Sequence, residues 1–113
     1  MNKILAYAMA GLLLGTVFME TARAEKSEYD VGRSWFLNKC QICHGYKGDG
    51  KGPGGVYLTP QPRDFTNQRF WNDKTAETIT YTVTHGLKPM PAFNLNPEDI
   101  KAIINYMSQT FKR

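Results

Sequence analysis

Two cysteines and a histidine lie close together in the first half of the chain. Cys40, Cys43 and His44 form the pattern C-x-x-C-H. Cysteines three positions apart on a helix face the same side, so both thiols can add to the vinyl groups of one porphyrin. The histidine that follows can then reach the iron from the same side. This spacing is that of an attachment site for c-type haem.

Three other kinds of site also use a pair of cysteines. A Cys40–Cys43 disulfide would close a very short loop and stabilise little. A thioredoxin-like redox pair belongs in a βαβ setting, which this sequence does not indicate. A zinc site would need both cysteines, His44 and His85, but adjacent Cys43 and His44 rarely point at one tetrahedral centre. The pattern therefore favours haem.

A c-type haem usually has a second axial ligand, for which the sequence offers few candidates. Met90 lies between two prolines in the segment KPMP, whose stiff backbone would hold a weak thioether ligand in place. His85 is the main competitor, although a histidine near a helix end is also favourable beside the helix dipole. Met107 falls on the apolar face of an expected helix, where core packing is the usual role. We predict Met90, because Met/His ligation goes with electron-transfer cytochromes.

The first 24 residues have the layout of a secretory signal peptide. Lys3 supplies a positive charge, residues 4–18 are almost wholly apolar, and residues 22–24 (ARA) form a small-x-small cleavage site. The apolar run is shorter than the roughly 20 residues that span a bilayer, so an uncleaved anchor is the less favoured alternative. We expect cleavage after Ala24, a single domain over residues 25–113, a periplasmic location and no integral membrane protein.

Size and charge exclude several classes of protein. A chain of 113 residues holds one domain. The net charge of +4 is mild and no run of Lys or Arg occurs, so nucleic-acid binding has little support. A domain this small often relies on a staple, which a buried cofactor can supply.

Two of the helices that must position the motif have clear sequence signals. The first begins near Ser27, and Gly32, Phe36 and Cys40 then line one face. The last begins at the N-cap Asn96 and carries an apolar stripe that we expect to pack across Gly32 and Phe36. The stripe consists of Ile100, Ile103, Ile104, Met107 and Phe111.

The middle of the chain is harder to interpret. Residues 78–84 alternate between threonine and apolar residues as a strand would, but the flanking cap signals and Gly86 favour a helix over residues 75–85. Between the first two helices, six glycines and three prolines over residues 45–62 predict an irregular loop wrapped closely around a flat cofactor.

Taken together, these residues resemble the class I cytochromes c, specifically small single-haem bacterial members. The resemblance covers residues 27–111 and rests on Gly32 and Phe36 before the C-x-x-C-H motif, on Met90 in the run MPAF, and on Ile103 with Tyr106 in the last helix. It implies an all-α fold, with about three main helices and a Gly/Pro-rich loop around one covalently bound haem c. It also implies an electron carrier, not an enzyme, that serves redox partner proteins.

The resemblance further implies that the carbonyl of Pro53 accepts a hydrogen bond from His44. It extends to the segment 62–66 (PRDFT), which has no assigned role; Arg63 there either pairs with a haem propionate or is solvated. Trp71 and Tyr81 either line the haem or belong to the core. Four lysines near the motif or the methionine loop would steer acidic partners, or are ordinary solubilising lysines. They are Lys39, Lys47, Lys51 and Lys88.

Two alternative functions stay open at this point. A labile Met90 would leave a vacant iron site and make the protein a haem enzyme or a small-ligand sensor. The same chemistry would also suit a cytochrome subunit of a larger oxidoreductase.

Overall fold

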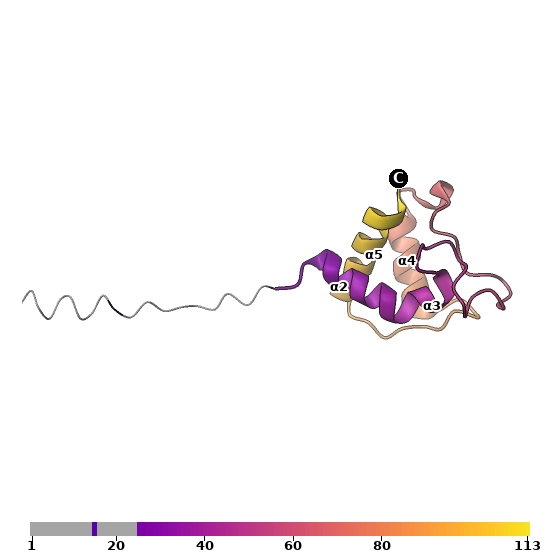
Figure 1. Cartoon of the computed structure of the whole chain (residues 1–113), viewed down its shortest axis with the longest axis horizontal. Helices are drawn as coiled ribbons and strands as arrows, with labels where there is room; N and C mark the ends of the chain where they lie inside the picture. The colour runs from indigo at the N-terminus through magenta and orange to yellow at the C-terminus, as the bar shows by residue number, and fades with distance from the viewer. Residues whose placement is uncertain (1–14, 16–24) are drawn as a thin grey trace, which may run out of the picture.

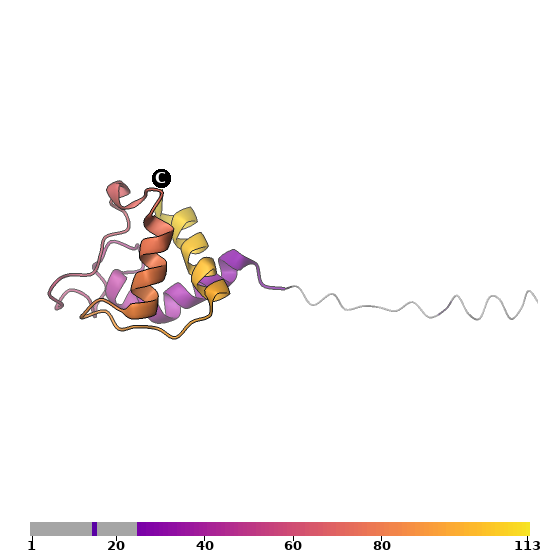
Figure 2. The same cartoon turned by 180° about the vertical axis from the view of Figure 1, so that it is seen from behind.

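The computed structural model describes Gly15 and residues 25–113, so the predicted signal peptide lies almost wholly outside the described residues. The described part is helical and contains no strand, as predicted (Figures 1 and 2). Within it, no helix is long and apolar enough to cross a membrane. The main helices are α2 (Glu28–Trp35), α3 (Gln41–His44), α4 (Thr75–His85) and α5 (Pro97–Phe111).

The first helix begins where the sequence predicts. The Ser27 hydroxyl accepts a hydrogen bond from the backbone N–H of Asp30 at 3.1 Å and so caps α2. A π-helical stretch, Phe36–Cys40, joins α2 to α3, and the N–H of Gln41 reaches back to the carbonyl of Phe36. The chain therefore runs as one nearly continuous helical segment into the cysteine motif, with a local widening that the sequence does not reveal.

The ambiguous middle segment is a helix, and α4 has the bounds that the cap signals predict. Ile79 and Val83, four positions apart, are buried, whereas Tyr81 is 64 % exposed. This burial follows the helical period and not the alternation of the sequence. Gly86 ends the helix with φ of +74°, a conformation that favours glycine.

The last helix, α5, crosses α2 and has α4 beside it (Figures 1 and 2). Asn96 caps α5 by accepting a hydrogen bond from the N–H of Asp99 at 2.8 Å. The predicted stripe forms the core together with Phe36, which is fully buried, although Ile104 is only partly buried. The expected packing of this stripe across Gly32 and Phe36 is confirmed.

The glycine-rich loop wraps around the C-terminal end of α3. The N–H of Gly52 donates to the carbonyl of Cys43 at 3.0 Å, and the N–H of Gly54 donates to Ile42 at 2.7 Å. A Cβ atom on Gly52 would overlap the carbonyl oxygens of Gln41 and Ile42 in α3. The loop thus lies flat against the backbone of the cysteine motif.

Candidate haem site

An apolar cavity of about 260 Å³ lies between the cysteine motif and the loop that follows α4. Cys40, Cys43 and His44 contribute to its wall, and Met90 contributes from the other end of the chain. The structure therefore brings the four predicted haem-binding side chains to one cavity. Most of the remaining wall is apolar and includes Phe36, Phe65, Ile79, Val83, Phe93, Ile103 and Met107.

These residues fit a c-type haem. Two thiols, an imidazole and a thioether are the groups that attach the porphyrin and ligate its iron. The charged side chains that line the cavity are the cations Lys39, Arg63 and Lys88, and no carboxylate lines it among the described residues. Cations of this kind suit the haem propionates.

Burial sets the protonation of the donor groups. It raises the pKa of the Cys40 thiol to about 11, and the nearby Cys43 contributes to the same shift. Burial also lowers the pKa of His44; the hydrogen bond with the Arg63 carbonyl opposes this shift, and the positive charge of Arg63 adds a smaller lowering. His44 is thus a neutral imidazole near pH 7, the form that can ligate a metal.

The same observations disfavour the other uses of the cysteines. A redox-active cysteine has a lowered pKa, whereas that of Cys40 is raised. The two thiols are not joined in a disulfide. Within residues 25–113, no group of three or more His, Cys, Asp or Glu side chains is arranged to hold a metal ion such as zinc.

The imidazole of His44 is held at its edge and on its face. Its Nδ1 atom lies 3.2 Å from the carbonyl oxygen of Arg63. Its ring stacks on that of Phe65, with the centroids 4.6 Å apart and the planes 22° from parallel. The sequence did not predict either contact, because the partners are about twenty residues away along the chain.

The Arg63 contact corrects the role predicted for Pro53. In the structure it is the carbonyl of Arg63, not that of Pro53, that lies at the Nδ1 atom of His44. The reason is the path of the loop, because Gly52 and Gly54, on either side of Pro53, are bonded to the α3 backbone. The residues on both sides of Pro53 are therefore held by hydrogen bonds to the main chain of the cysteine motif.

The segment 62–66 now has a structural role. The Asp64 carboxylate accepts hydrogen bonds from the N–H and hydroxyl of Thr66 at 2.8 and 2.5 Å, and the hydroxyl bond is the main reason that its pKa is lowered. This turn presents the Arg63 carbonyl and the Phe65 ring to His44. A short, charged segment of this kind gives no sign in the sequence that it will meet the histidine.

The methionine loop, which carries Met90 after the end of α4, is short and is held by backbone hydrogen bonds. Leu87 and Met90 exchange two backbone hydrogen bonds, at 3.0 and 2.7 Å. The N–H of Phe93 donates to the carbonyl of Val83 at 2.8 Å, which ties the loop back to α4. Met90 is therefore held by its backbone on both sides, as the flanking prolines suggested.

The competing ligands are placed differently. His85 lies at the exposed end of α4, where it stacks on Tyr81 with the ring centroids 4.2 Å apart, and it does not line the cavity. Met107 is buried in the core and also contributes to the cavity wall. Neither Tyr81 nor Trp71 lines the cavity. Trp71 is partly buried and donates from Nε1 to the carbonyl of Phe65 at 2.8 Å.

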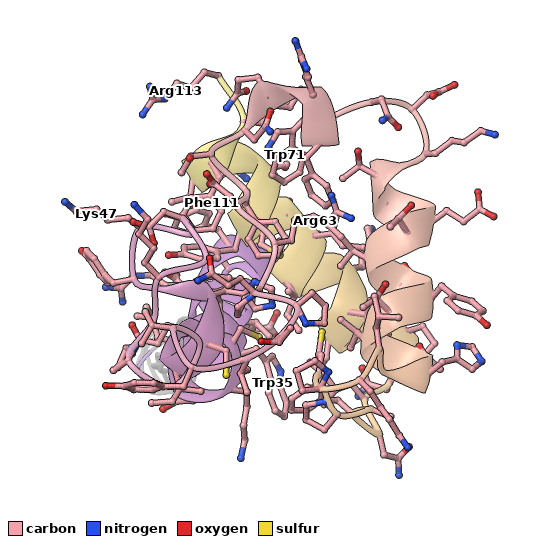
Figure 3. The ribbon with its side chains drawn as sticks, turned by 90° about the vertical axis from the view of Figure 1, so that its right-hand side faces the viewer. Trp35, Lys47, Arg63, Trp71, Phe111 and Arg113 are labelled. Carbon is pink, nitrogen blue, oxygen red and sulfur yellow. The ribbon has the colours of Figure 1, made fainter. Side chains whose placement is uncertain are left out.

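The four candidate lysines divide into two pairs. Lys39 and Lys88 line the cavity and are exposed, whereas Lys47 and Lys51 do not line it. The Arg63 guanidinium lies 5.3 Å from the centre of the Phe70 ring. In Figure 3 Arg63 lies between the loop region and α4, while Lys47 extends away from the body of the molecule.

Comparisons with known proteins agree with this site. Residues 27–107 match the family model described as "Cytochrome C oxidase, cbb3-type, subunit III". The chain is also 28% identical over 104 residues to a protein of Synechocystis sp. named "Cytochrome c-553-like", covering 92% of this chain and 90% of that protein. No solved structure matches. The chain therefore belongs to this cytochrome c family and is a small electron-transfer cytochrome with a covalently bound haem c.

Proposed function

We propose that this cytochrome is an exported one-electron carrier that holds its haem iron between His44 and Met90. The haem, when bound, supplies reversible exchange between ferrous and ferric iron. The observation that carries the proposal is the convergence of Cys40, Cys43, His44 and Met90 on one apolar cavity. His44 reaches the cavity from the end of α3 and Met90 from the loop that follows α4, so these two residues would hold the haem iron from separate parts of the chain.

The carrier role, in preference to catalysis, follows from the proposed ligands. Two protein ligands leave no coordination position for a substrate. The described residues that line the cavity include no carboxylate and no second histidine that would act as an acid–base pair beside Met90. Titration of the ferric protein with cyanide tests this. Slow, weak binding is expected, whereas tight and rapid binding would favour a haem enzyme or ligand sensor.

Partner proteins would dock where the cavity opens to solvent. Ile42 and Leu87 line the cavity yet are 55 % and 67 % exposed, and the exposed Lys39 and Lys88 lie with them on its wall. An apolar contact with a basic rim suits a partner whose docking surface is acidic.

Export to the periplasm is the remaining part of the proposal. It rests on the positive, apolar and small-x-small pattern of residues 1–24. The intact mass of the exported protein tests it directly. We expect a chain that begins at Glu25 and carries one haem, whereas a retained N-terminal segment would indicate an anchored protein.

The description of the matched family names an oxidase subunit, so a cytochrome subunit of a larger oxidoreductase is the second candidate to test. The redox chemistry of this candidate would be the same. Size-exclusion chromatography of solubilised cells at high salt separates the two. Elution of the cytochrome alone supports the carrier, and co-elution with a large complex supports the subunit.

A further inference from the structure

We propose that Phe65 is a positioning residue for His44, and that Trp71 in turn holds Phe65 in place. Together they would set the rotational orientation of the imidazole. This inference rests on the proposed function, because it takes His44 to be an iron ligand. It assigns a role to two aromatic residues that the haem chemistry does not itself require.

The contact at Nδ1 is not sufficient to fix the ring. The Arg63 carbonyl holds one ring nitrogen at 3.2 Å, and ligation would use the other, Nε2. A hydrogen bond to a carbonyl oxygen tolerates a broad range of directions, so this contact alone only weakly resists rotation of the imidazole about its Cβ–Cγ bond. The stacked ring of Phe65, with its plane 22° from that of His44, opposes this rotation. Edge and face are thus held by one short segment, residues 63–65.

Phe65 can serve this purpose because it is itself fixed. Its side chain is buried, and its N–H donates to the carbonyl of Gly48 at 2.7 Å. Its ring also packs against Phe70, with the centroids 5.2 Å apart. Fixing of a metal-ligating histidine by neighbouring groups controls both its orientation and its strength as a ligand.

Trp71 completes the arrangement. Its indole N–H donates to the Phe65 carbonyl at 2.8 Å, and its ring meets that of Phe70 nearly edge-on, at 79°. Trp71 does not line the cavity, so its effect on the iron would pass through Phe65. Loss of this single N–H would release the Phe65 carbonyl without changing the cavity wall.

The test measures imidazole orientation in the haem-loaded ferric protein by proton NMR. The spread of the four haem-methyl resonances depends on the direction of the axial imidazole plane. We expect Phe65→Leu to narrow the spread of the haem-methyl shifts. An imidazole that samples several orientations gives each methyl group an average of the corresponding shifts, and these averages differ less from one another. Trp71→Phe should narrow the spread less than Phe65→Leu does. Phe65→Tyr keeps an aromatic ring at position 65 and should show the native spread. The low-spin optical spectrum should stay unchanged throughout.

Ile100→Val is the matched control, since Ile100 is buried but does not line the cavity, and it lies near the start of α5, far along the helix from Phe111, the α5 residue that stacks on Phe65. An unchanged spread in both Phe65→Leu and Trp71→Phe would overturn the proposal. An equal narrowing in Ile100→Val would also overturn it, because the effect would then come from a loosened core. If Phe65→Leu does not fold, Trp71→Phe decides alone. A low-spin spectrum retained in His44→Ala would instead remove the ligand assignment on which the proposal rests.

Discussion

Gly32 of α2 lies directly against the backbone carbonyl of Ala102 in α5. A Cβ atom at position 32 would overlap this carbonyl and would also come within 2.9 Å of the Cβ of Tyr106. The closest approach of the two helices therefore depends on one hydrogen atom in place of a methyl group. Phe36, which follows one turn later, is fully buried at the same crossing.

This contact predicts a large effect of Gly32→Ala. The added methyl group meets backbone and not a flexible side chain, so the helices must separate. We expect the free energy of unfolding to fall by about 1–3 kcal/mol, the usual cost of overpacking. Arg33→Ala, an exposed change in the same helix, should stay within about 0.5 kcal/mol. Denaturant titration measures both; a stable Gly32→Ala protein would contradict the crossing.

Met90 and Met107 both line the cavity, but only Met90 is proposed as an iron ligand. We expect Met90→Ala to lower the reduction potential, because Met/His ligation raises it. Cyanide affinity should rise by at least about tenfold, or about 1.4 kcal/mol, because the internal competitor is gone. Met107→Leu is the control and should change neither property. Methionine sulfur bound to ferric iron gives a weak long-wavelength absorption band. Loss of this band in Met107→Leu but not in Met90→Ala would assign the sulfur ligand to Met107.

The division of the lysines predicts different kinetic effects. Lys39→Glu and Lys88→Glu should each slow electron transfer with an acidic redox protein at low ionic strength, by about tenfold, because they reverse charge at the cavity opening. The difference should shrink at high salt. Lys47→Glu changes the net charge equally but lies away from the cavity, and should have a smaller effect. Equal slowing in all three variants would indicate net charge and not a docking site.

Covalent attachment predicts that the motif is needed for folding. In the double variant Cys40→Ala/Cys43→Ala the cavity of about 260 Å³ would lose the tether of the group that fills it. We expect no accumulation of folded exported protein and no haem staining on a denaturing gel. Normal yields of a folded, haem-free protein would show that the core forms without the cofactor.

The sequence was sufficient to predict the helices because their signals are local. The cap at Ser27, the bounds of α4 at Gly86 and the start of α5 at Asn96 each depend on residues within a few positions. The crossing at Gly32 was also predictable, because a lone glycine on an apolar helix face indicates close approach. The π-helical stretch before Cys40 was not, because its residues, FLNKC, include no glycine or proline that would signal a departure from the α-helix.

The surroundings of His44 were not predictable for a different reason. Its contacts with Arg63 and Phe65 join segments about twenty residues apart across an irregular loop, and no periodicity fixes the path of such a loop. The role predicted for Pro53 therefore moved to Arg63. The choice of Met90 over His85 used the local stiffness of the loop and the ligand pair that goes with electron-transfer cytochromes, and the structure places Met90 at the cavity and His85 outside it.

The most direct test of the account is the optical spectrum of the native exported protein, oxidised and reduced. Ligation by His44 and Met90 predicts a low-spin c-type spectrum with the weak long-wavelength band of methionine sulfur on ferric iron, absent in Met90→Ala. A low-spin spectrum that lacks the band in the native protein would contradict the methionine ligand and point to another strong ligand such as His85. A high-spin spectrum would contradict the closed coordination on which the carrier role depends.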